Sequence, residues 1–251
     1  MKKFGLIGHP LGHSFSKKYF SEKFEKEGIE DTVYDNYPIE DIAEFEPLYK
    51  NDPDLAGVNV TIPYKESIIP YLDVLSEDAR NIQAVNTVCL CTKTGRLVKV
   101  GHNTDTVGFR TSLEEHLAET PDKALVLGTG GSSKAVVYVL EEMGVEVIRV
   151  SSSGKEGAIG YADLNDKIIK KAKLIVNTTP LGMEPDVHSF PDIPYDALTT
   201  DHLLFDLVYN PVVTRFMQEG RNRGASAVNG YDMLVYQAEE AWEIWNRAIK
   251  V

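Results

Sequence analysis

The second half of this chain takes its fold from one stretch, Lys123-Ala124-Leu125-Val126-Leu127-Gly128-Thr129-Gly130-Gly131-Ser132-Ser133. Its first five residues predict a buried strand, and the segment Lys134–Met143 after the glycines predicts a helix. This arrangement suits the pyrophosphate of a dinucleotide, because glycine admits the phosphates to the backbone and the helix start offers N–H groups. The alternative is a plain glycine-rich β–α turn, and Ser133 in place of the third glycine weakens the motif.

The end of the next predicted strand, Val145–Val150, indicates which dinucleotide fits. An acidic side chain there would bind the ribose 2′-hydroxyl of NAD. The chain instead has Ser151-Ser152-Ser153, with Arg149 and Lys155 close by. Because no carboxylate opposes a 2′-phosphate, the sequence favours NADP, and NAD stays the alternative. Both cations can equally be solvated surface charges.

Strand-like and helix-like segments alternate along nearly the whole chain, which predicts βαβ units and mainly parallel sheets. The pattern restarts near Thr106, so we expect an α/β protein of two lobes with a cleft between them. The first is a substrate-binding lobe with a mainly parallel twisted sheet, residues 1–102 completed by a C-terminal helix at 231–251. The second, residues 103–230, is a Rossmann-like dinucleotide-binding lobe.

These lobes are expected from the following segments. The strands are Phe4–Gly8, Thr32–Tyr37, Ala56–Thr61, Ala84–Cys91, Leu97–Val100, Lys123–Leu127, Val145–Val150, Leu174–Asn177, Leu203–Leu207 and Ala225–Val228. The helices are Ser16–Lys26, Ile39–Tyr49, Thr106–Leu117, Lys134–Met143, Tyr161–Lys171, Thr214–Arg223 and Tyr231–Lys250.

The composition limits the class of partner. The chain has 251 residues and a formal net charge of −12, which opposes binding to nucleic acids and to anionic membranes. The sequence contains no apolar run long enough to span a membrane, and we expect no signal peptide, because no apolar run of signal-peptide length follows Lys2 and Lys3. Cys89 and Cys91 are two residues apart on a predicted strand, a geometry too strained for a good disulfide. We therefore expect a cytoplasmic protein with free thiols, rather than a redox or metal role for them.

Polar side chains stand where several strands of the first half begin or end. In open α/β sheets, ligands bind at the carboxyl ends of the strands. Hydroxyls, an amide, a lysine and a carboxylate suit a small polyhydroxylated acid. Taken singly, Ser14, Ser16 or Asp105 is more typical of a helix N-cap than of a ligand contact. The segments are Gly8–Ser16, Asn59–Lys65, Ala84–Thr87 and His102–Asp105.

Taken together, these segments make the chain resemble the shikimate dehydrogenase family over nearly its whole length. The order and spacing of eight motifs carry the resemblance. They are Gly8-x-Pro10-x-x-His13-Ser14-x-Ser16, Asn59-Val60-Thr61-x-Pro63-x-Lys65, Ala84-Val85-Asn86-Thr87, Asn103-Thr104-Asp105-x-x-Gly108, Gly128-x-Gly130-Gly131, Asn177-x-Thr179-Pro180-x-Gly182-Met183, Asp206-x-x-Tyr209-x-Pro211 and Asn229-Gly230-x-x-Met233-Leu234-Val235-x-Gln237-Ala238.

The resemblance implies an NADP-dependent alcohol dehydrogenase that reversibly reduces 3-dehydroshikimate to shikimate, on the route to chorismate and the aromatic amino acids. By position, Lys65 and Asp105 match the family's catalytic pair. The residues that match its substrate contacts are Ser14, Ser16, Thr61, Asn86, Tyr209 and Gln237. Those that match its cofactor side are Gly128, Gly130, Gly131, Ser132, Asn177, Thr178 and Met183, to which we add Ser151, Ser152 and Gly230 as expected contacts.

The chemistry is consistent with these roles. Hydride transfer to a ketone leaves an alkoxide that needs a proton, and the reverse reaction needs a base. A lysine serves if partial burial lowers its pKa, and a nearby carboxylate orients it while partly opposing that shift. We therefore expect Lys65 to be the acid/base and Asp105 to position both Lys65 and a ring hydroxyl. The serines, Tyr209 and Gln237 would anchor the substrate carboxylate as neutral donors.

Three features depart from the family pattern. Lys17 replaces a usual proline, and Ser151-Ser152-Ser153 replaces a usual Asn-Arg-Thr, so the arginine expected on the adenine and 2′-phosphate is missing. The following helix is also lost, because Gly154–Gly160 indicates a loop before the shorter helix Tyr161–Lys171. The adenosine pocket must therefore be built differently.

Other functions fit the sequence less well. A serine hydrolase lacks its Gly-x-Ser-x-Gly turn, and we expect no metal, because His9 and His13 have no acidic ligand at useful spacing. An enzyme that also uses quinate remains open. So does a catalytically silent cofactor-binding regulatory homologue, although a silent protein needs no Lys65–Asp105 pair. Either a monomer or a homodimer is compatible with the sequence.

Overall fold

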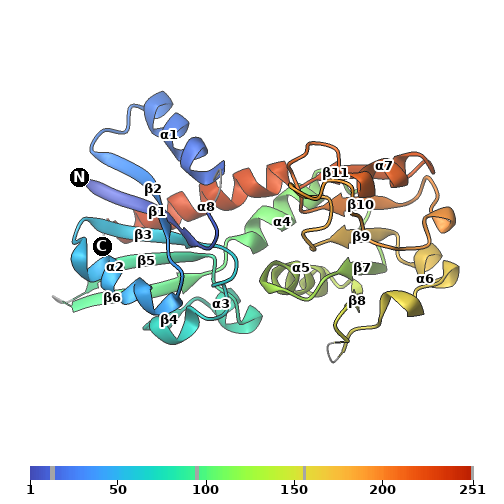
Figure 1. The fold of residues 1–251 in the computed structure, drawn as a ribbon, viewed down its shortest axis with the longest axis horizontal. Helices are drawn as coiled ribbons and strands as arrows, with labels where there is room; N and C mark the ends of the chain where they lie inside the picture. Colours follow the sequence, from blue (N-terminus) through green and yellow to red (C-terminus); the bar gives the residue numbers. More distant parts are fainter. Residues whose placement is uncertain (12–14, 94–95, 155–156, 250–251) are drawn as a thin grey trace. The chain divides into compact units, whose positions relative to one another are not determined.

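The computed structural model describes residues 1–11, 15–93, 96–154 and 157–249. The chain divides into two compact units (Figure 1): Met1–Thr104 with Ala238–Val251, and Asp105–Gln237. Helix α8 (Tyr231–Ile249) begins in the second unit and ends in the first. No helix of the described residues is both long and apolar enough to cross a membrane.

The first unit is built on a six-stranded sheet of order β2-β1-β3-β5-β6-β4. β5 runs antiparallel to β3 and β6, whereas the other pairings are parallel. The carboxyl ends of β1, β3 and β6 and the amino end of β5 therefore lie at one edge. The strands are β1 (Lys2–Gly8), β2 (Thr32–Pro38), β3 (Leu55–Val60), β4 (Val74–Leu75), β5 (Thr87–Lys93) and β6 (Arg96–His102).

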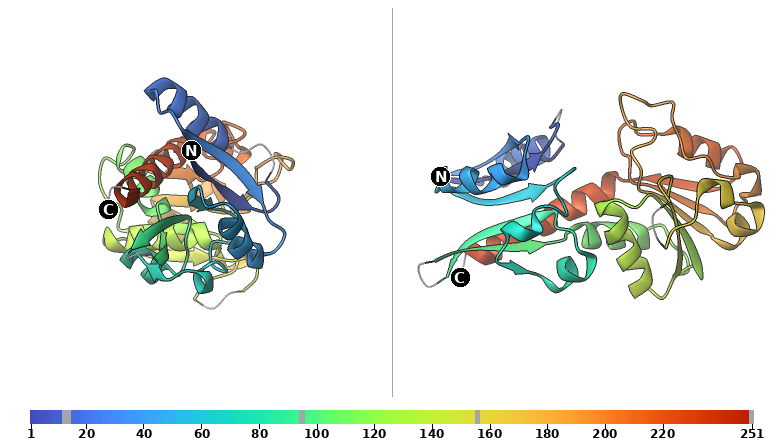
Figure 2. Two further views of the ribbon diagram at one scale, coloured as in Figure 1. Left: turned by 90° about the vertical axis from the view of Figure 1, so that its left-hand side faces the viewer. Right: turned by 60° about the horizontal axis from the view of Figure 1, so that its bottom comes forward.

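Helices cover both faces of this sheet. Helix α1 (Phe15–Glu27) and the end of α8 lie on one face (Figure 2). Their aromatic side chains pack there, and Phe4 is stacked on Trp245 at 4.6 Å between ring centroids. Gly57 permits this contact, because a Cβ there would lie 2.3 Å from the Trp245 indole nitrogen. The other face carries the short helices η1 (Ile42–Glu44), α2 (Phe45–Asn51), η2 (Ile69–Tyr71) and α3 (Glu77–Ile82).

The second unit is built on a five-stranded, wholly parallel sheet of order β11-β10-β9-β7-β8. The chain goes outward from β7 to β8 and then returns to β9 on the other side, so the strand order reverses between β7 and β9. Ligands bind at the carboxyl ends of strands at such a switch point. The strands are β7 (Lys123–Leu127), β8 (Glu146–Val150), β9 (Leu174–Asn177), β10 (Leu203–Asp206) and β11 (Ser226–Asn229).

Two apolar clusters hold helices to this sheet. The first joins it to α4 (Asp105–Glu114), α5 (Gly131–Glu142) and Met233 of α8. The second joins it to the elements on the other face: η3 (Tyr161–Asp163), α6 (Asp166–Lys171), η4 (Tyr195–Ala197) and α7 (Arg215–Arg221).

The expected α/β class, with a mainly parallel sheet in the first unit and a Rossmann-like sheet in the second, is confirmed, and most predicted segments are within a few residues of the observed ones. The predicted helix Ile39–Tyr49 is wrong at its start, because Asp41 caps η1 and α2 begins only at Phe45. The strand predicted from Ala84 begins at Thr87. β4 and α3 were not predicted. The segment Gly154–Gly160 forms no helix in its described part, and Ile159 pairs with the edge of β8.

Candidate active site

The glycine loop lies at the switch point of the second sheet. Gly128 has φ +109°, and a Cβ there would lie 2.6 Å from the Thr178 hydroxyl. That hydroxyl and the Thr178 amide both donate to the Leu127 carbonyl, at 2.6 and 2.9 Å. Ser133 donates its hydroxyl to the Gly128 carbonyl at 2.8 Å. Ser133, which stands in place of the third glycine of the motif, therefore closes the loop and does not disrupt it.

The start of α5 has the properties of an anion site. Gly130 occupies the N-cap position without a side-chain cap, and the first turn contains no acidic residue. A Cβ on Gly130 would meet no atom within 4 Å, so the space beside the loop is open. The positive end of the helix dipole is thus not neutralised by a carboxylate of its own turn, and the loop suits a pyrophosphate.

The serine turn after β8 is a compact local structure. Ser151 is buried, and its hydroxyl accepts from the Ser153 amide at 3.2 Å and lies 3.0 Å from the Ser153 hydroxyl. Ser152 is exposed. The guanidinium of Arg149 lies along the returning segment, because a Cβ on Gly157 would be 2.6 Å from it. Lys155, the other predicted cation, lies outside the described residues.

The end of β9 places the residues predicted for the nicotinamide side. Asn177 is fully buried, and its side-chain Oδ1 accepts from the amide and the hydroxyl of Thr179, at 3.1 and 2.6 Å. Met183 is exposed on a turn that follows Gly182 at φ +88°. Gly230 is required by close packing, because a Cβ there would lie 2.4 Å from the Leu207 carbonyl oxygen.

In the first unit, the predicted residues gather at the sheet edge where β1, β3 and β6 end. Lys65 is half-buried in the segment after β3, and its carbonyl accepts from the Val85 amide at 2.7 Å. Thr61 lies against Gly8, at which a Cβ would be 2.5 Å from the threonine methyl group. These contacts bring the ends of β1 and β3 and the segment before β5 together.

Asn86 has a structural contact that the sequence did not reveal. Its side-chain oxygen accepts from the Thr104 amide at 2.7 Å, and its Nδ2 donates to the Thr104 hydroxyl at 3.0 Å. Asn86 thus fixes the residue that precedes Asp105, and its neighbour Val85 binds the backbone of Lys65. The segment 85–86 therefore anchors both the backbone of Lys65 and Thr104, the residue before Asp105.

The serine predicted to bind substrate joins a second buried chain of hydrogen bonds. Ser16 is buried on α1 and bonds to the Tyr34 phenol, whose pKa is raised by burial and only partly lowered by this bond. The Tyr34 hydroxyl donates to Asn59 at 2.8 Å, and Asn59 donates to the Thr87 hydroxyl at 3.0 Å. Ser14 lies outside the described residues.

Asp105 and Gln237 belong to two helices that pack closely within the second unit. Asp105 is the first residue of α4 and is 6% exposed. A Cβ on Gly108, one turn later, would lie 2.5 Å from the Met233 carbonyl and 3.0 Å from the Gln237 Cβ. Tyr209 is half-buried in the loop after β10, and burial raises the pKa of its phenol, which keeps the hydroxyl protonated near neutral pH.

One buried carboxylate was not assigned a role from the sequence. Asp206, at the end of β10, is fully buried and accepts hydrogen bonds from Asn177, Val208 and Thr214. Burial raises its pKa to about 6, although these donors oppose the shift. The motif Asp206-x-x-Tyr209-x-Pro211 was the available signal, but nothing in it indicates burial.

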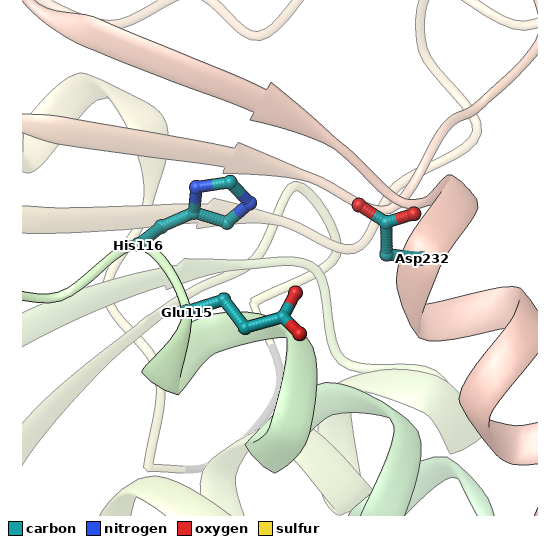
Figure 3. Close-up of side chains that lie close together, drawn as sticks. All are labelled: Glu115, His116 and Asp232. Atoms are coloured by element: carbon teal, nitrogen blue, oxygen red, sulfur yellow. The ribbon is translucent and has the colours of Figure 1, made fainter.

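Among the described residues, one group of His, Asp and Glu side chains is compact enough to hold a metal ion: Glu115, His116 and Asp232 (Figure 3). All three are exposed, and their ligand atoms lie within 4.8 Å of one another. The Tyr236 hydroxyl donates to Glu115 at 2.5 Å, and Asp232 stands in the first turn of α8, where the helix dipole favours an anion. Because these contacts explain the carboxylates, we assign no metal here.

Comparison with known proteins identifies the family of this chain. A family model for the shikimate dehydrogenase substrate binding domain matches residues 6–88. The shikimate dehydrogenase (NADP(+)) of Caldicellulosiruptor saccharolyticus is 40% identical over 98% of this chain and 92% of its own length. That of Carboxydothermus hydrogenoformans is 38% identical, over 96% of this chain and 90% of its own.

Solved structures give the same result for the fold. The shikimate 5-dehydrogenase of Thermus thermophilus, in complex with NADP(H) and shikimate, has a TM-score of 0.85 and 32% identity, over 98% of this chain and 93% of that one. The shikimate dehydrogenase 1 of Peptoclostridium difficile has a TM-score of 0.83 and 35% identity, over 98% and 92%. Identity at this level over nearly the whole chain shows common ancestry as well as common fold. This chain therefore belongs to the shikimate dehydrogenase family.

Proposed function

We propose that this protein is an NADP-dependent shikimate dehydrogenase, which reversibly reduces 3-dehydroshikimate to shikimate. One observation carries the proposal: the segment 85–86 binds the backbone of Lys65 and also fixes Thr104, next to Asp105. Proton exchange with a hydroxyl needs an acid/base such as Lys65, which a carboxylate such as Asp105 can orient. The family membership and the glycine loop supply the rest of the support.

The residues of the second unit fit NADP. The uncapped start of α5 and the open space beside Gly130 suit the pyrophosphate. Ser152 and Ser153 are exposed and would offer hydroxyl donors to a 2′-phosphate where a carboxylate would favour NAD, while the buried Ser151 holds the turn together. Thr178 and Met183 would face the nicotinamide, and Asn177 would hold their loop in place. When bound, the cofactor supplies the hydride and its two electrons.

Lys65 is the proposed acid/base. In the reduction, the alkoxide that hydride transfer leaves on the ring takes a proton from the Lys65 ammonium. In the oxidation, the neutral amine takes the hydroxyl proton. Asp105 accepts a hydrogen bond from this hydroxyl and orients the lysine. In this proposal Asp105 acts as a hydrogen-bond acceptor, and it stands in the first turn of α4, where the helix dipole stabilises negative charge.

Neutral donors bind the remaining substrate groups in this proposal. Ser14, Ser16 and Tyr209 hydrogen-bond the carboxylate, and Thr61, Asn86 and Gln237 contact the ring hydroxyls or the carboxylate. Tyr209 suits this task because burial keeps its phenol protonated. Asn86 also holds Thr104, so its replacement affects both substrate binding and the position of Asp105.

A series of direct spectrophotometric assays tests the proposal. The wild-type protein is assayed for NADPH formation with shikimate, and then with quinate and with NAD. Lys65→Met is compared with Lys18→Met, an exposed lysine of α1, and Asp105→Asn with Asp166→Asn, another first-turn aspartate. We expect Lys65→Met to lower kcat by about 10²–10⁴-fold while shikimate still binds. Wild-type activity on quinate alone, no activity at all, or normal turnover of Lys65→Met would refute the assignment.

The remaining expectations are part of the same proposal. The first unit would bind substrate and the second the cofactor, in a cytoplasmic monomer or homodimer. Cys89 and Cys91 are free thiols in the structure, which suits a reducing compartment. Light scattering after gel filtration measures the mass against that of a 27.9 kDa chain, and a tetramer would contradict the expected state.

A further inference from the structure

We propose that Asp206 is a positioning residue, which holds the loop that carries Tyr209 in register with the end of β9. This inference rests on the proposed substrate role of Tyr209. Asp206 itself touches neither ligand in the proposal, and it acts through the hydrogen bonds that it accepts.

The carboxylate joins three separate segments. Its Oδ1 accepts from the Asn177 side chain at 2.9 Å and from the Val208 amide at 3.1 Å, and its Oδ2 accepts from the Thr214 hydroxyl at 2.5 Å. The Thr214 hydroxyl in turn accepts from the Met217 amide at the start of α7. Asp206 thereby connects the end of β9, the loop 207–213 and the first turn of α7.

The loop 207–213 depends on these bonds at both of its ends. Val208 and Thr214 bracket Tyr209, and both bind the same carboxylate. A second anchor comes from Asn229, which donates to the Val212 carbonyl at 2.8 Å. Val212 is 70% exposed, so side-chain packing contributes little at the tip of the loop. The position of Tyr209 therefore depends on the hydrogen bonds at the base of the loop.

The surroundings of Asp206 contain neutral donors. Asn177 faces it from β9, Thr214 from the start of α7, and Asn229 pairs with it on β11. Tyr195 is an ionisable side chain that responds to its charge, because the pKa of Tyr195 is raised first by burial and then by Glu219 and Asp206. Asp206 is fully buried, and burial raises its pKa to about 6. Burying an anion without a cation beside it costs free energy, so an uncharged side chain would stabilise the fold better at this position. Stability alone therefore does not explain the carboxylate of Asp206.

Four variants separate positioning from a purely structural role. Asp206→Asn keeps the size and removes the charge, and Thr214→Val removes one donor while Thr214→Ser keeps it. His202→Asn is the matched control, because His202 is equally buried at the other end of β10 and bonds to Thr199 and Ile169. For each variant we would measure the Tm, the Kd of NADP, and kcat and KM for shikimate from pH 5.5 to 8.5. Rates are normalised to the folded fraction.

We expect Asp206→Asn and Thr214→Val to lower kcat/KM for shikimate between about tenfold and 100-fold, as a misplaced substrate contact does. Thr214→Ser should restore it, and His202→Asn should lower only the Tm. If Asp206→Asn does not fold, the Thr214 pair decides. The inference would be overturned if Asp206→Asn had the same kcat/KM as His202→Asn. If Asp206→Asn does not fold, the same comparison is made between Thr214→Val and His202→Asn. A shift in KM in Thr214→Val that is also present in Thr214→Ser would overturn the inference as well.

A double-mutant cycle with Tyr209→Phe tests whether Asp206 acts through Tyr209. We expect the double variant to be no worse than Tyr209→Phe alone, because the hydroxyl to be positioned is already gone. Effects that multiply would overturn this inference and leave the proposed function intact. If Tyr209→Phe alone had no effect on shikimate kinetics, the substrate role of Tyr209 would fail, and this inference with it.

Discussion

The buried carboxylate of Asp206 makes the stability of the protein depend on pH in a direction opposite to that of most acidic side chains. Its pKa is about 6 in the folded protein, because burial disfavours the anion. Between the ordinary pKa of an aspartate and pH 6, the unfolded chain has lost this proton while the folded chain keeps it. The free energy of unfolding therefore falls as the pH rises through this window.

The magnitude follows from the difference between the two pKa values. A folded pKa of about 6 against roughly 3.9 in the unfolded chain, at about 1.4 kcal/mol for each pH unit, gives a loss of about 3 kcal/mol. The loss begins near pH 4, is complete above pH 6 and stays constant beyond. Asp206→Asn cannot ionise and so lacks this loss.

The test compares the wild type with Asp206→Asn in urea unfolding from pH 4.5 to pH 8, followed by circular dichroism. Both tryptophans, Trp242 and Trp245, lie in the first unit, so their fluorescence would not report on the unit that contains Asp206. Subtracting the unfolding free energy of the wild type from that of Asp206→Asn removes the contribution of the other carboxylates, which both proteins contain. The difference should move in favour of Asp206→Asn by about 2 kcal/mol between pH 4.5 and pH 8, because part of the total loss has already occurred at pH 4.5. A difference that is flat, or that moves in favour of the wild type, would refute the reasoning.

Four further substitutions test the packing and the loops. Gly57→Ala should lower the free energy of unfolding by about 1–3 kcal/mol in chemical denaturation, because its Cβ would lie 2.3 Å from the Trp245 nitrogen; an unchanged midpoint would contradict this contact. Gly130→Ala should leave the Tm nearly unchanged but raise the Kd of NADP at least tenfold in calorimetry, because its Cβ enters space that is open only without cofactor. Ser152→Arg should lower the Kd of NADP about tenfold and leave that of NAD unchanged, since a guanidinium binds a phosphate but not a hydroxyl; an equal gain for both would show stacking instead. Asn165→Ala should cost about 1 kcal/mol in thermal unfolding, because the side chain caps α6 through two amides.

The parts of the fold that the sequence predicted best are those set by local chemistry. The strand Lys123–Leu127 was predicted with its observed bounds, because a short apolar run and a glycine loop delimit it on the carboxyl side. The helix predicted over Ile39–Tyr49 begins later because the Asp41 side chain caps a turn at Ile42–Glu44, and hydrophobic periodicity does not detect a cap of this kind. The two-residue strand Val74–Leu75 is too short to leave a periodic signal.

In the candidate site, the sequence likewise predicted which residues belong to the site but not which residues surround them. Motif positions were enough to name Lys65, Asn86 and Asp105, but not to show that Asn86 holds the residue before Asp105. That bond joins residues 18 positions apart and depends on the antiparallel pairing of β5 with β6. The burial of Asp206 is likewise a property of the assembled sheet, since its donors come from β9 and from the start of α7. No local pattern contains that information.

The net charge of −12 and the proposed binding of two anionic ligands are compatible because the binding groups are dipoles. Hydroxyls, amides and one helix start act over a few ångströms, where a long-range repulsion adds little. Such donors also lose less on desolvation than lysine or arginine side chains would. Discrimination between NADP and NAD is weakened as a result, because a guanidinium would bind the 2′-phosphate with a positive charge that the serine turn lacks. The proposed selectivity for NADP therefore depends on the missing carboxylate near Ser151 more than on an added cation, and selectivity of that kind is expected to be modest.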